Sequence, residues 1–286
     1  MSDALPLPSR PDLEQYKKLA KDFQAACRSI EPGAFPVCAR RWLETLARLQ
    51  RVELNGAVAD RIDRVSRHMH RRWLTRQRDD RRTRCLLADA QLFVAREHGF
   101  ASWPKFAGHV EQLRQHDSPV ANYEATADAV VSGDITTVSR LLRTHPDLVR
   151  ARSTREHRST LLHYVSANGV EDYRQKTPSN IVEIARLLLD AGADVNAASE
   201  AYGGGSTTLG LVATSIHPEQ AGVQGALMEL LLQRGASLEQ PGAAGNGHGI
   251  VKDALGRARE ARRDFLRAAA RRWTSKKRPA WGAWIS

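Results

Sequence analysis

The feature that most constrains the fold of this chain is an internal repeat over residues 121–249. Three segments each contain an apolar helical face that ends in Leu-Leu and is followed by a turn and an extended stretch; they are 129–152, 181–199 and 226–242. A short unit of this kind cannot bury its apolar face alone, so neighbouring units must stack into a continuous core. The pattern therefore predicts an all-α fold over this region, built as a solenoid of helix pairs.

The motifs inside these segments resemble the ankyrin repeat. Residues 188–196 read Leu-Leu-Asp-Ala-Gly-Ala-Asp-Val-Asn, the complete signature that closes such a repeat, and residues 231–239 restate part of it. Thr160 and His163 stand at the Thr and His positions of the signature that opens one. The resemblance implies that Thr160 caps the first helix of a repeat, that Gly192 ends the second in a left-handed conformation, and that His163 hydrogen-bonds within the finger turn. It also implies protein binding without catalysis.

The repeats are longer than the ankyrin period of about 33 residues. The Leu-Leu pairs that begin at Leu188 and Leu231 lie 43 residues apart, and insertions at 170–180 and 200–207 contain additional residues. Insertions in repeat proteins fall in loops on one face, which is often the binding face. We therefore expect a partner protein to bind the concave face and the finger loops through exposed polar and aromatic side chains. The side chains expected to contact this partner are Arg155, His157, Tyr173, Arg174, Gln175, Ser199, Glu200 and Tyr202.

A small helical domain over 12–118 is expected before the repeats. Residues 1–11 contain three prolines and predict a flexible tail, either mobile or docked, and residues 116–124 are expected to link the two domains. Residues 88–113 resemble the helical segment that precedes the repeats in bacterial ankyrin-repeat proteins, which implies no defined activity. Apolar spacings of three and four residues predict the helices of this domain at 13–26, 42–52, 58–77, 86–98 and 103–115.

The net charge of +11 is distributed unevenly along the chain. Residues 1–120 carry a net charge of +7, residues 121–249 a net charge of −4, and residues 250–286 a net charge of +8. The last segment is expected to form a basic capping helix and tail. Basic ends attract nucleic acid and other anionic partners.

An alternative interpretation is a nucleic-acid-associated regulator that uses the basic segments 61–84 or 252–278. The first segment holds ten arginines and only three aspartates. The competing interpretation is an ordinary solvated helix, because those aspartates can neutralise neighbouring arginines and because basic runs are weak motifs. The arginines predicted to share one nucleic-acid-binding face are Arg64, Arg67, Arg71 and Arg78.

Several classes of protein are disfavoured by the sequence. No segment approaches the roughly 20 apolar residues that span a bilayer. The cysteines, at 27, 38 and 85, are too few and too scattered for a disulfide framework, which predicts reduced thiols in a cytoplasmic protein. Neither the ligand spacing of a metal site nor a catalytic or cofactor-binding motif is evident. We therefore expect a non-enzymatic monomer without cofactor, metal site or membrane association.

Overall fold

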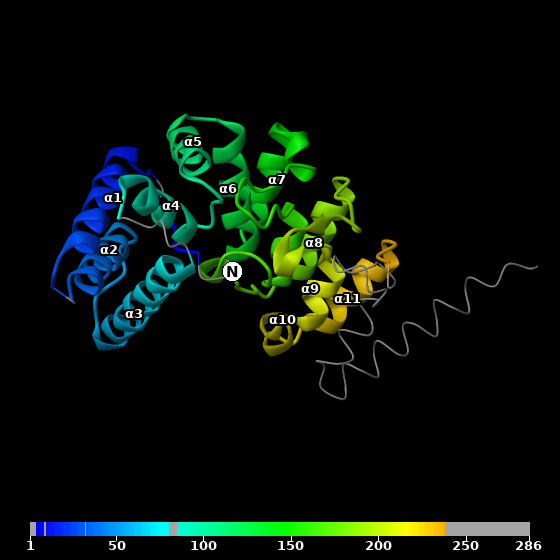
Figure 1. Cartoon of the computed structure of the whole chain (residues 1–286). Coiled ribbons are helices and arrows are strands. Elements are labelled where there is room, and N and C mark those ends of the chain that lie inside the picture. The colour runs from blue at the N-terminus through cyan, green and yellow to red at the C-terminus, as the bar shows by residue number, and fades with distance from the viewer. Residues whose placement is uncertain (1–3, 9, 32, 80–84, 238–286) are drawn as a thin grey trace, which may run out of the picture.

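The structure, a computed structural model, describes residues 4–8, 10–31, 33–79 and 85–237. It shows two helical units that lie side by side, with α1 to α5 in the first unit and α6 to α11 in the second (Figure 1). Within these described residues, β-structure is limited to two strands of two residues each. The predicted all-α fold with ankyrin-type helix pairs is confirmed. The capping helix and tail predicted at 250–286 lie outside the described residues.

The first unit is built around aromatic side chains of α1. Asp12 caps α1 by accepting a hydrogen bond from the backbone N–H of Glu14 at 3.1 Å. Tyr16, on the buried face of α1, makes edge contacts with the rings of Trp42 and Phe106. These contacts join three helices into one core. The helices of this unit are α1 (Leu13–Arg28), α2 (Ala34–Leu49), α3 (Gly56–Asp79), α4 (Leu87–Glu97) and α5 (Trp103–Arg114).

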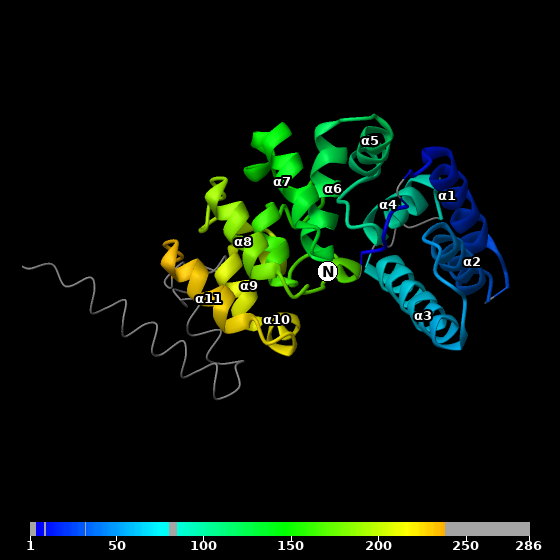
Figure 2. The same ribbon diagram turned by 180° about the vertical axis from the view of Figure 1, so that it is seen from behind.

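The beginning of the described chain is docked between the two units, as both views show (Figure 1 and Figure 2). The side chain of Leu5 is buried, and its backbone N–H donates to the carbonyl of Glu97 at 2.7 Å. The carbonyl of Leu5 accepts a hydrogen bond from Nδ1 of His98 at 3.0 Å. Burial lowers the pKa of His98 to about 3, so the imidazole is neutral and carries its proton on Nδ1. Of the segment 1–11, expected to be flexible, residues 4–8 are therefore held against the fold.

The second unit consists of stacked helix pairs. α6 begins at the Ser-Pro pair in which Ser118 accepts from the backbone N–H of Ala121 at 3.0 Å, so the linker predicted at 116–124 is wrong. Pro119 at the first helical position needs no N–H partner, which favours a helix start. The pairs are α6 (Pro119–Ser132) with α7 (Ile135–Thr144), η2 (Leu161–Ser166) with α8 (Ile181–Asp190), and α9 (Thr208–Thr214) with α11 (Gln224–Gln233). Between them lie the short helices η1 (Pro146–Val149), η3 (Asp172–Arg174), η4 (Ala201–Gly203) and α10 (Ile216–Gln220).

The turn chemistry of the repeats agrees with the sequence. Gly192 and Gly235 follow the ends of α8 and α11 with φ of 96° and 89°, the left-handed region that glycine adopts without strain. His163 accepts from the backbone N–H of Thr160 through Nδ1 and reaches the carbonyl of Ser206 through Nε2 at 3.2 Å. This histidine therefore ties one repeat to the finger hairpin of the next, in which β1 (Ala198–Ser199) pairs antiparallel with β2 (Ser206–Thr207).

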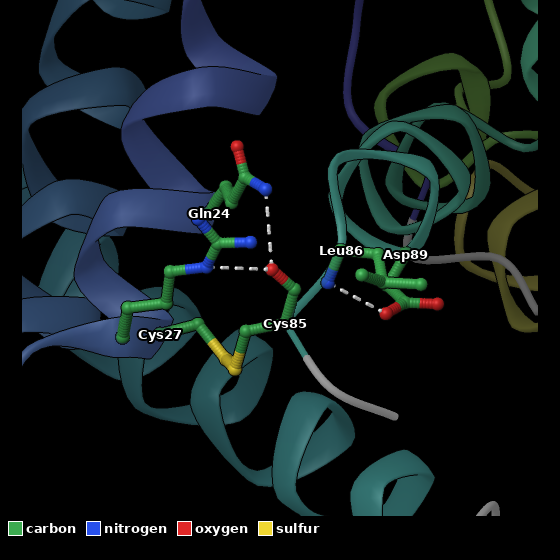
Figure 3. The surroundings of a disulfide bond; sticks show 6 residues. Gln24, Cys27, Cys85, Leu86 and Asp89 are labelled. Carbon is green, nitrogen blue, oxygen red and sulfur yellow. Dashed lines mark hydrogen bonds between the residues drawn. A yellow bond between two sulfur atoms is a disulfide. The ribbon is translucent and has the colours of Figure 1, made fainter. Parts of the chain in front are cut away.

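A disulfide joins Cys27, at the end of α1, to Cys85, immediately before α4 (Figure 3). The prediction of reduced thiols is therefore wrong for this pair, because the helical packing places two cysteines 58 residues apart in sequence next to each other. The carbonyl of Cys85 also accepts hydrogen bonds from Gln24 at 3.2 Å and from Arg28 at 3.1 Å. Cys38 remains a free thiol, and burial raises its pKa to about 12. The first unit is thus covalently closed around α2 and α3.

A candidate binding cleft between the helical unit and the repeats

The loop before η2 fastens the repeats to the first unit. Arg155 in this loop is 1% exposed, and its Nη1 donates to the carbonyl of His98 at 2.6 Å. Its guanidinium also lies over the ring of Phe100, 5.2 Å from the ring centroid. The backbone N–H of the next residue, Glu156, donates to the carbonyl of Gly99 at 3.0 Å. A charged side chain and a backbone bond therefore hold the two units together at the C-terminal end of α4.

Four buried charges form a cluster behind this loop, which we call the charge cluster: Arg155, Glu171, Arg174 and Glu124. Nε of Arg155 lies 2.6 Å from Oε1 of Glu171. Nη1 of Arg174 lies 2.7 Å from Oε2 of Glu124 and 3.5 Å from Oε1 of Glu171. The cluster contains two positive and two negative groups, so its net charge is zero. Glu124 comes from α6, whereas Glu171 and Arg174 come from the insertion at 170–180.

The electrostatics of the cluster explain why buried carboxylates are tolerated. Burial by itself would raise the pKa of Glu171, but Arg155 and Arg174 outweigh it and hold that pKa well below its usual range. The same two guanidinium groups lower the pKa of Glu124 against the effect of its burial. Both carboxylates are therefore ionised at neutral pH. Removing one partner from such a buried pair leaves an uncompensated charge, which costs about 3–5 kcal/mol.

A cleft opens on the outer side of the charge cluster. Its volume is about 50 Å³, and it is bordered by the loop before η2, the insertion at 170–180 and the finger hairpin. Glu171 lines this cleft with a completely buried side chain, and its Oε2 has no hydrogen-bond partner. Tyr202 lines it from the finger hairpin and is 62% exposed. The backbone N–H of Glu200 donates to the carbonyl of His157 at 2.8 Å, which fixes the hairpin to the loop. The cleft walls are thus connected by backbone bonds.

A larger open groove of about 710 Å³ adjoins the cleft. One wall is α5, with Lys105, Gly108 and His109, and the other is the loop before η2. Glu156 and Glu200 line both the groove and the cleft, so the two hollows share a border. The arrangement can accommodate an extended chain along the groove and one side chain in the cleft. The further residues that line the groove are Ala101, Pro104, Gln112, Val120, Thr154, Arg155 and Arg158.

The family comparison concerns the repeat that carries this cleft. The sequence profile of the ankyrin repeat matches residues 157–200, which span η2, the insertion at 170–180, α8 and β1. The chain contains an ankyrin repeat. No curated protein matches the chain. Within the ankyrin repeat, the insertion carries Glu171 and Arg174 and so provides half of the charge cluster.

Four of the eight predicted contact residues line the cleft, and the other four do not. Those that line it are Arg155, His157, Glu200 and Tyr202. The expectation of exposure is wrong for Arg155, Arg174 and Ser199, which are buried. The first two belong to the charge cluster, and the hydroxyl of Ser199 donates to the carbonyl of Ser206 at 3.3 Å. Glu200 and Tyr202 are exposed at the border of the cleft. Their role as partner contacts remains a prediction.

The remaining predicted residues, His157, Tyr173 and Gln175, are half-buried and form hydrogen bonds inside the protein. Nδ1 of His157 accepts from the backbone N–H of Ser159, so Nε2 carries the proton and donates to Glu171 at 3.2 Å. The hydroxyl of Tyr173 accepts from Nη2 of Arg155 at 3.1 Å. Gln175 donates to the carbonyl of Val170 at 2.9 Å. All three side chains thus form hydrogen bonds to other residues of the protein.

The sequence did not point to three acidic residues of the cleft and the charge cluster: Glu124, Glu156 and Glu171. Glu124 lies in the stretch taken for a linker, and its burial depends on α6 packing against the ankyrin repeat. Glu171 lies two residues before Tyr173, a predicted contact residue in the same insertion, and this closeness is the signal that could have pointed to it. A lone glutamate in a polar loop otherwise indicates solvated surface.

The basic face predicted for α3 remains a prediction, and the structure describes the side chains of three of its four arginines. Arg64, Arg67 and Arg71 are exposed, and they make no ion pair with any residue that the structure describes. Arg72, in contrast, pairs with Glu97 of α4. Arg78 belongs to the last turn of α3. None of the three exposed arginines lines the cleft.

Two further observations bear on other kinds of site. Among the residues that the structure describes, no group of three or more His, Cys, Asp or Glu side chains is arranged to hold a metal ion. None of the helices in that part of the chain is both long and apolar enough to cross a membrane.

Proposed function

We propose that this chain is a non-enzymatic protein-recognition module whose partner binds in the groove between α5 and the finger loops. The observation that carries the proposal is the open groove of about 710 Å³, which adjoins the ankyrin repeat and ends at the cleft. Ankyrin repeats are generally interaction modules, and stacked repeats create extended concave surfaces that serve for binding. No feature of the sequence identifies the partner.

The rigidity of the groove supports this proposal. The wall formed by the loop before η2 is anchored on two sides, since Arg155 holds the loop to His98 and since Glu200 holds the finger hairpin to the same loop. A preformed surface loses less conformational entropy when a partner binds, which increases affinity.

Blocking the groove tests the proposal. Gly108 on α5 lines the groove, and a Cβ added there would meet nothing within 4 Å, so Gly108→Arg fills the groove without straining the helix. Gly225 on α11 has the same open surroundings away from the groove and provides the matched control, Gly225→Arg. We expect capture of the partner from a lysate of the source cells to fall about tenfold or more for the first variant, equivalent to about 1.4 kcal/mol, and to stay unchanged for the second. Equal capture by both variants would exclude the groove.

The second candidate function is binding of nucleic acid by α3. It is favoured by Arg64, Arg67 and Arg71, which are exposed and form no ion pair with a residue that the structure describes, since exposed guanidinium groups can contact phosphates. Binding of a labelled duplex should weaken steeply with salt, with a slope close to the number of phosphates contacted. Replacing Arg64, Arg67 and Arg71 together by glutamine should reduce the slope of the salt dependence by about three. Binding that is absent at low salt would rule out this function.

The monomeric state and the cytoplasmic location are parts of the same proposal. Light scattering of the purified chain tests the first, and fractionation of the source cells tests the second. The disulfide between Cys27 and Cys85 bears on location, because such bonds persist in oxidising compartments and are rare in the cytosol. Finding these two thiols reduced in cells would support the cytoplasmic location.

A further inference from the structure

We propose that the cleft beside the charge cluster is an anchor pocket for one cationic side chain, lysine or arginine, of the bound partner. This inference rests on the proposed function, because it assigns a chemical specificity to the end of the same groove. Four observations carry it: the charge of the walls, an unsatisfied buried carboxylate oxygen, the size of the cleft and an exposed aromatic ring at its border.

The charge of the cleft walls favours a cation. Three carboxylates line the cleft, Glu156, Glu171 and Glu200, against one guanidinium, that of Arg155. The charge of Arg155 is already engaged by Glu171 at 2.6 Å and by the carbonyl of His98 at 2.6 Å. Glu156 and Glu200 are exposed at the border and form no ion pair with another described residue. A cation that enters the cleft therefore meets two carboxylates that it can pair with.

One carboxylate oxygen in the buried wall of the cleft has no hydrogen-bond partner. Oε1 of Glu171 is shared by Arg155, His157 and Arg174, whereas Oε2 has no partner although the side chain is fully buried. Leaving a buried acceptor unsatisfied is unfavourable, and more so when the acceptor is charged. An ammonium or guanidinium group supplies N–H donors and would satisfy this oxygen with a charge-assisted bond.

The size of the cleft selects a side-chain tip. A volume of about 50 Å³ exceeds the roughly 10–15 Å³ that a single water needs and is too small for a whole metabolite or cofactor. The cleft opens into the groove along the shared border at Glu156 and Glu200. A polypeptide that lies in the groove can therefore direct one long side chain into the cleft.

An aromatic ring completes the pocket. Tyr202 is 62% exposed beside the cleft, and its hydroxyl donates to Oδ1 of Asn168. Its backbone has φ of 55°, a left-handed conformation that is costly for a tyrosine. Strained residues of this kind cluster at binding sites. The face of a tyrosine ring attracts Lys and Arg side chains, so Tyr202 strengthens the same preference as the carboxylates.

The test uses the full chain and labelled heptapeptide pools that differ only at a fixed central residue, which is Lys, Arg, Gln or Glu. We expect the Lys pool, the Arg pool or both to bind at least about tenfold more tightly than the Gln and Glu pools, measured by fluorescence polarisation. The double variant Glu156→Gln/Glu200→Gln should abolish this preference. The control Glu183→Gln/Glu229→Gln changes the same charge on α8 and α11, away from the cleft, and should retain it. Tyr202→Ala should weaken binding of the preferred pool about fivefold.

The outcomes separate this inference from the function on which it rests. Equal binding of the Lys and Glu pools, or a preference that survives the double variant at the border, overturns the anchor pocket. If Gly108→Arg still reduces partner capture in that case, the proposed recognition function is retained and only the preference for a cationic side chain is excluded. If capture is also insensitive to Gly108→Arg, the proposed function falls as well.

Discussion

Nε of Arg155 lies 2.6 Å from Oε1 of Glu171, and both side chains are almost completely buried. The two residues belong to different loops on either side of η2, and Arg155 also binds the carbonyl of His98 in the first unit. One ion pair thus joins the insertion of the ankyrin repeat to the helical unit. This connection explains why an insertion at this position is ordered.

Breaking this pair should destabilise the whole chain. We expect Arg155→Met to lower the free energy of unfolding by about 3–5 kcal/mol, because Glu171 keeps its buried charge and loses its nearest partner. Unfolding in urea, followed by circular dichroism, measures the change. Arg150→Ala removes an exposed arginine close in sequence and should change stability by less than about 0.5 kcal/mol. A similar small effect for both variants would show that the pair contributes little.

Stability should fall in mildly acidic solution because three buried histidines are neutral in the fold. Burial lowers the pKa of His98 to about 3 and those of His109 and His163 to about 4. In the unfolded chain these groups bind protons below about pH 6.5, so each one favours unfolding by about 1.4 kcal/mol per pH unit as the pH falls from 6.5 toward 4.

The measurement is urea unfolding at pH 7.5, 6.5 and 5.5. The carboxylates of the charge cluster have lowered pKa values and lose their contribution only when the pH falls below about 4.5, so they do not affect this window. Stability that is constant from pH 7.5 to 5.5 would contradict the neutral state of the buried histidines.

Reduction of the disulfide should destabilise the helical unit. The bond between Cys27 and Cys85 closes a loop of 58 residues, which by chain entropy is worth about 4 kcal/mol. Alkylation of the denatured chain, followed by mass spectrometry, should modify only Cys38 before reduction and all three cysteines after it. Three alkylated cysteines in the untreated protein would show that the bond is absent in solution.

The docked N-terminal segment should contribute to stability. Leu5→Ala should lower the free energy of unfolding by about 2–3 kcal/mol, because it removes buried apolar surface from the core of the first unit. Leu54→Ala is the matched control, since Leu54 is 42% exposed, and its effect should stay below about 1 kcal/mol. Equal effects of the two substitutions, again in urea, would indicate that residues 4–8 are not held in solution.

Much of the helical architecture could be predicted from local patterns. The predicted helices at 86–98 and 103–115 correspond closely to α4 and α5, because apolar spacing and terminal residues such as Gly99 act within a few residues of the chain. The start of α6 was missed although Ser118 and Pro119 form a clear capping pair. That signal was present and was outweighed by the polar composition of the stretch.

The candidate site was predicted only in part. The positions of the insertions pointed to the correct loops, since sequence spacing alone shows where a repeat exceeds its period. Burial of Arg155 and Arg174 could not be inferred, because an arginine in a loop is normally solvated unless distant carboxylates compensate it. The pairing of Cys27 with Cys85 could not be inferred either, since no local sequence pattern indicates that two helix ends lie next to each other.

The sequence by itself determined the helices, the repeat and the ankyrin signature, because periodicity, caps and turn glycines depend on neighbouring residues. The tertiary structure decided which polar residues became buried in ion pairs and which stayed exposed to solvent. It did so by bringing α4, α6 and two loops of the repeat region together around Glu171, where long-range packing removes water and makes charge pairing obligatory. The same packing left Glu156, Glu200 and Tyr202 exposed at the border of the cleft.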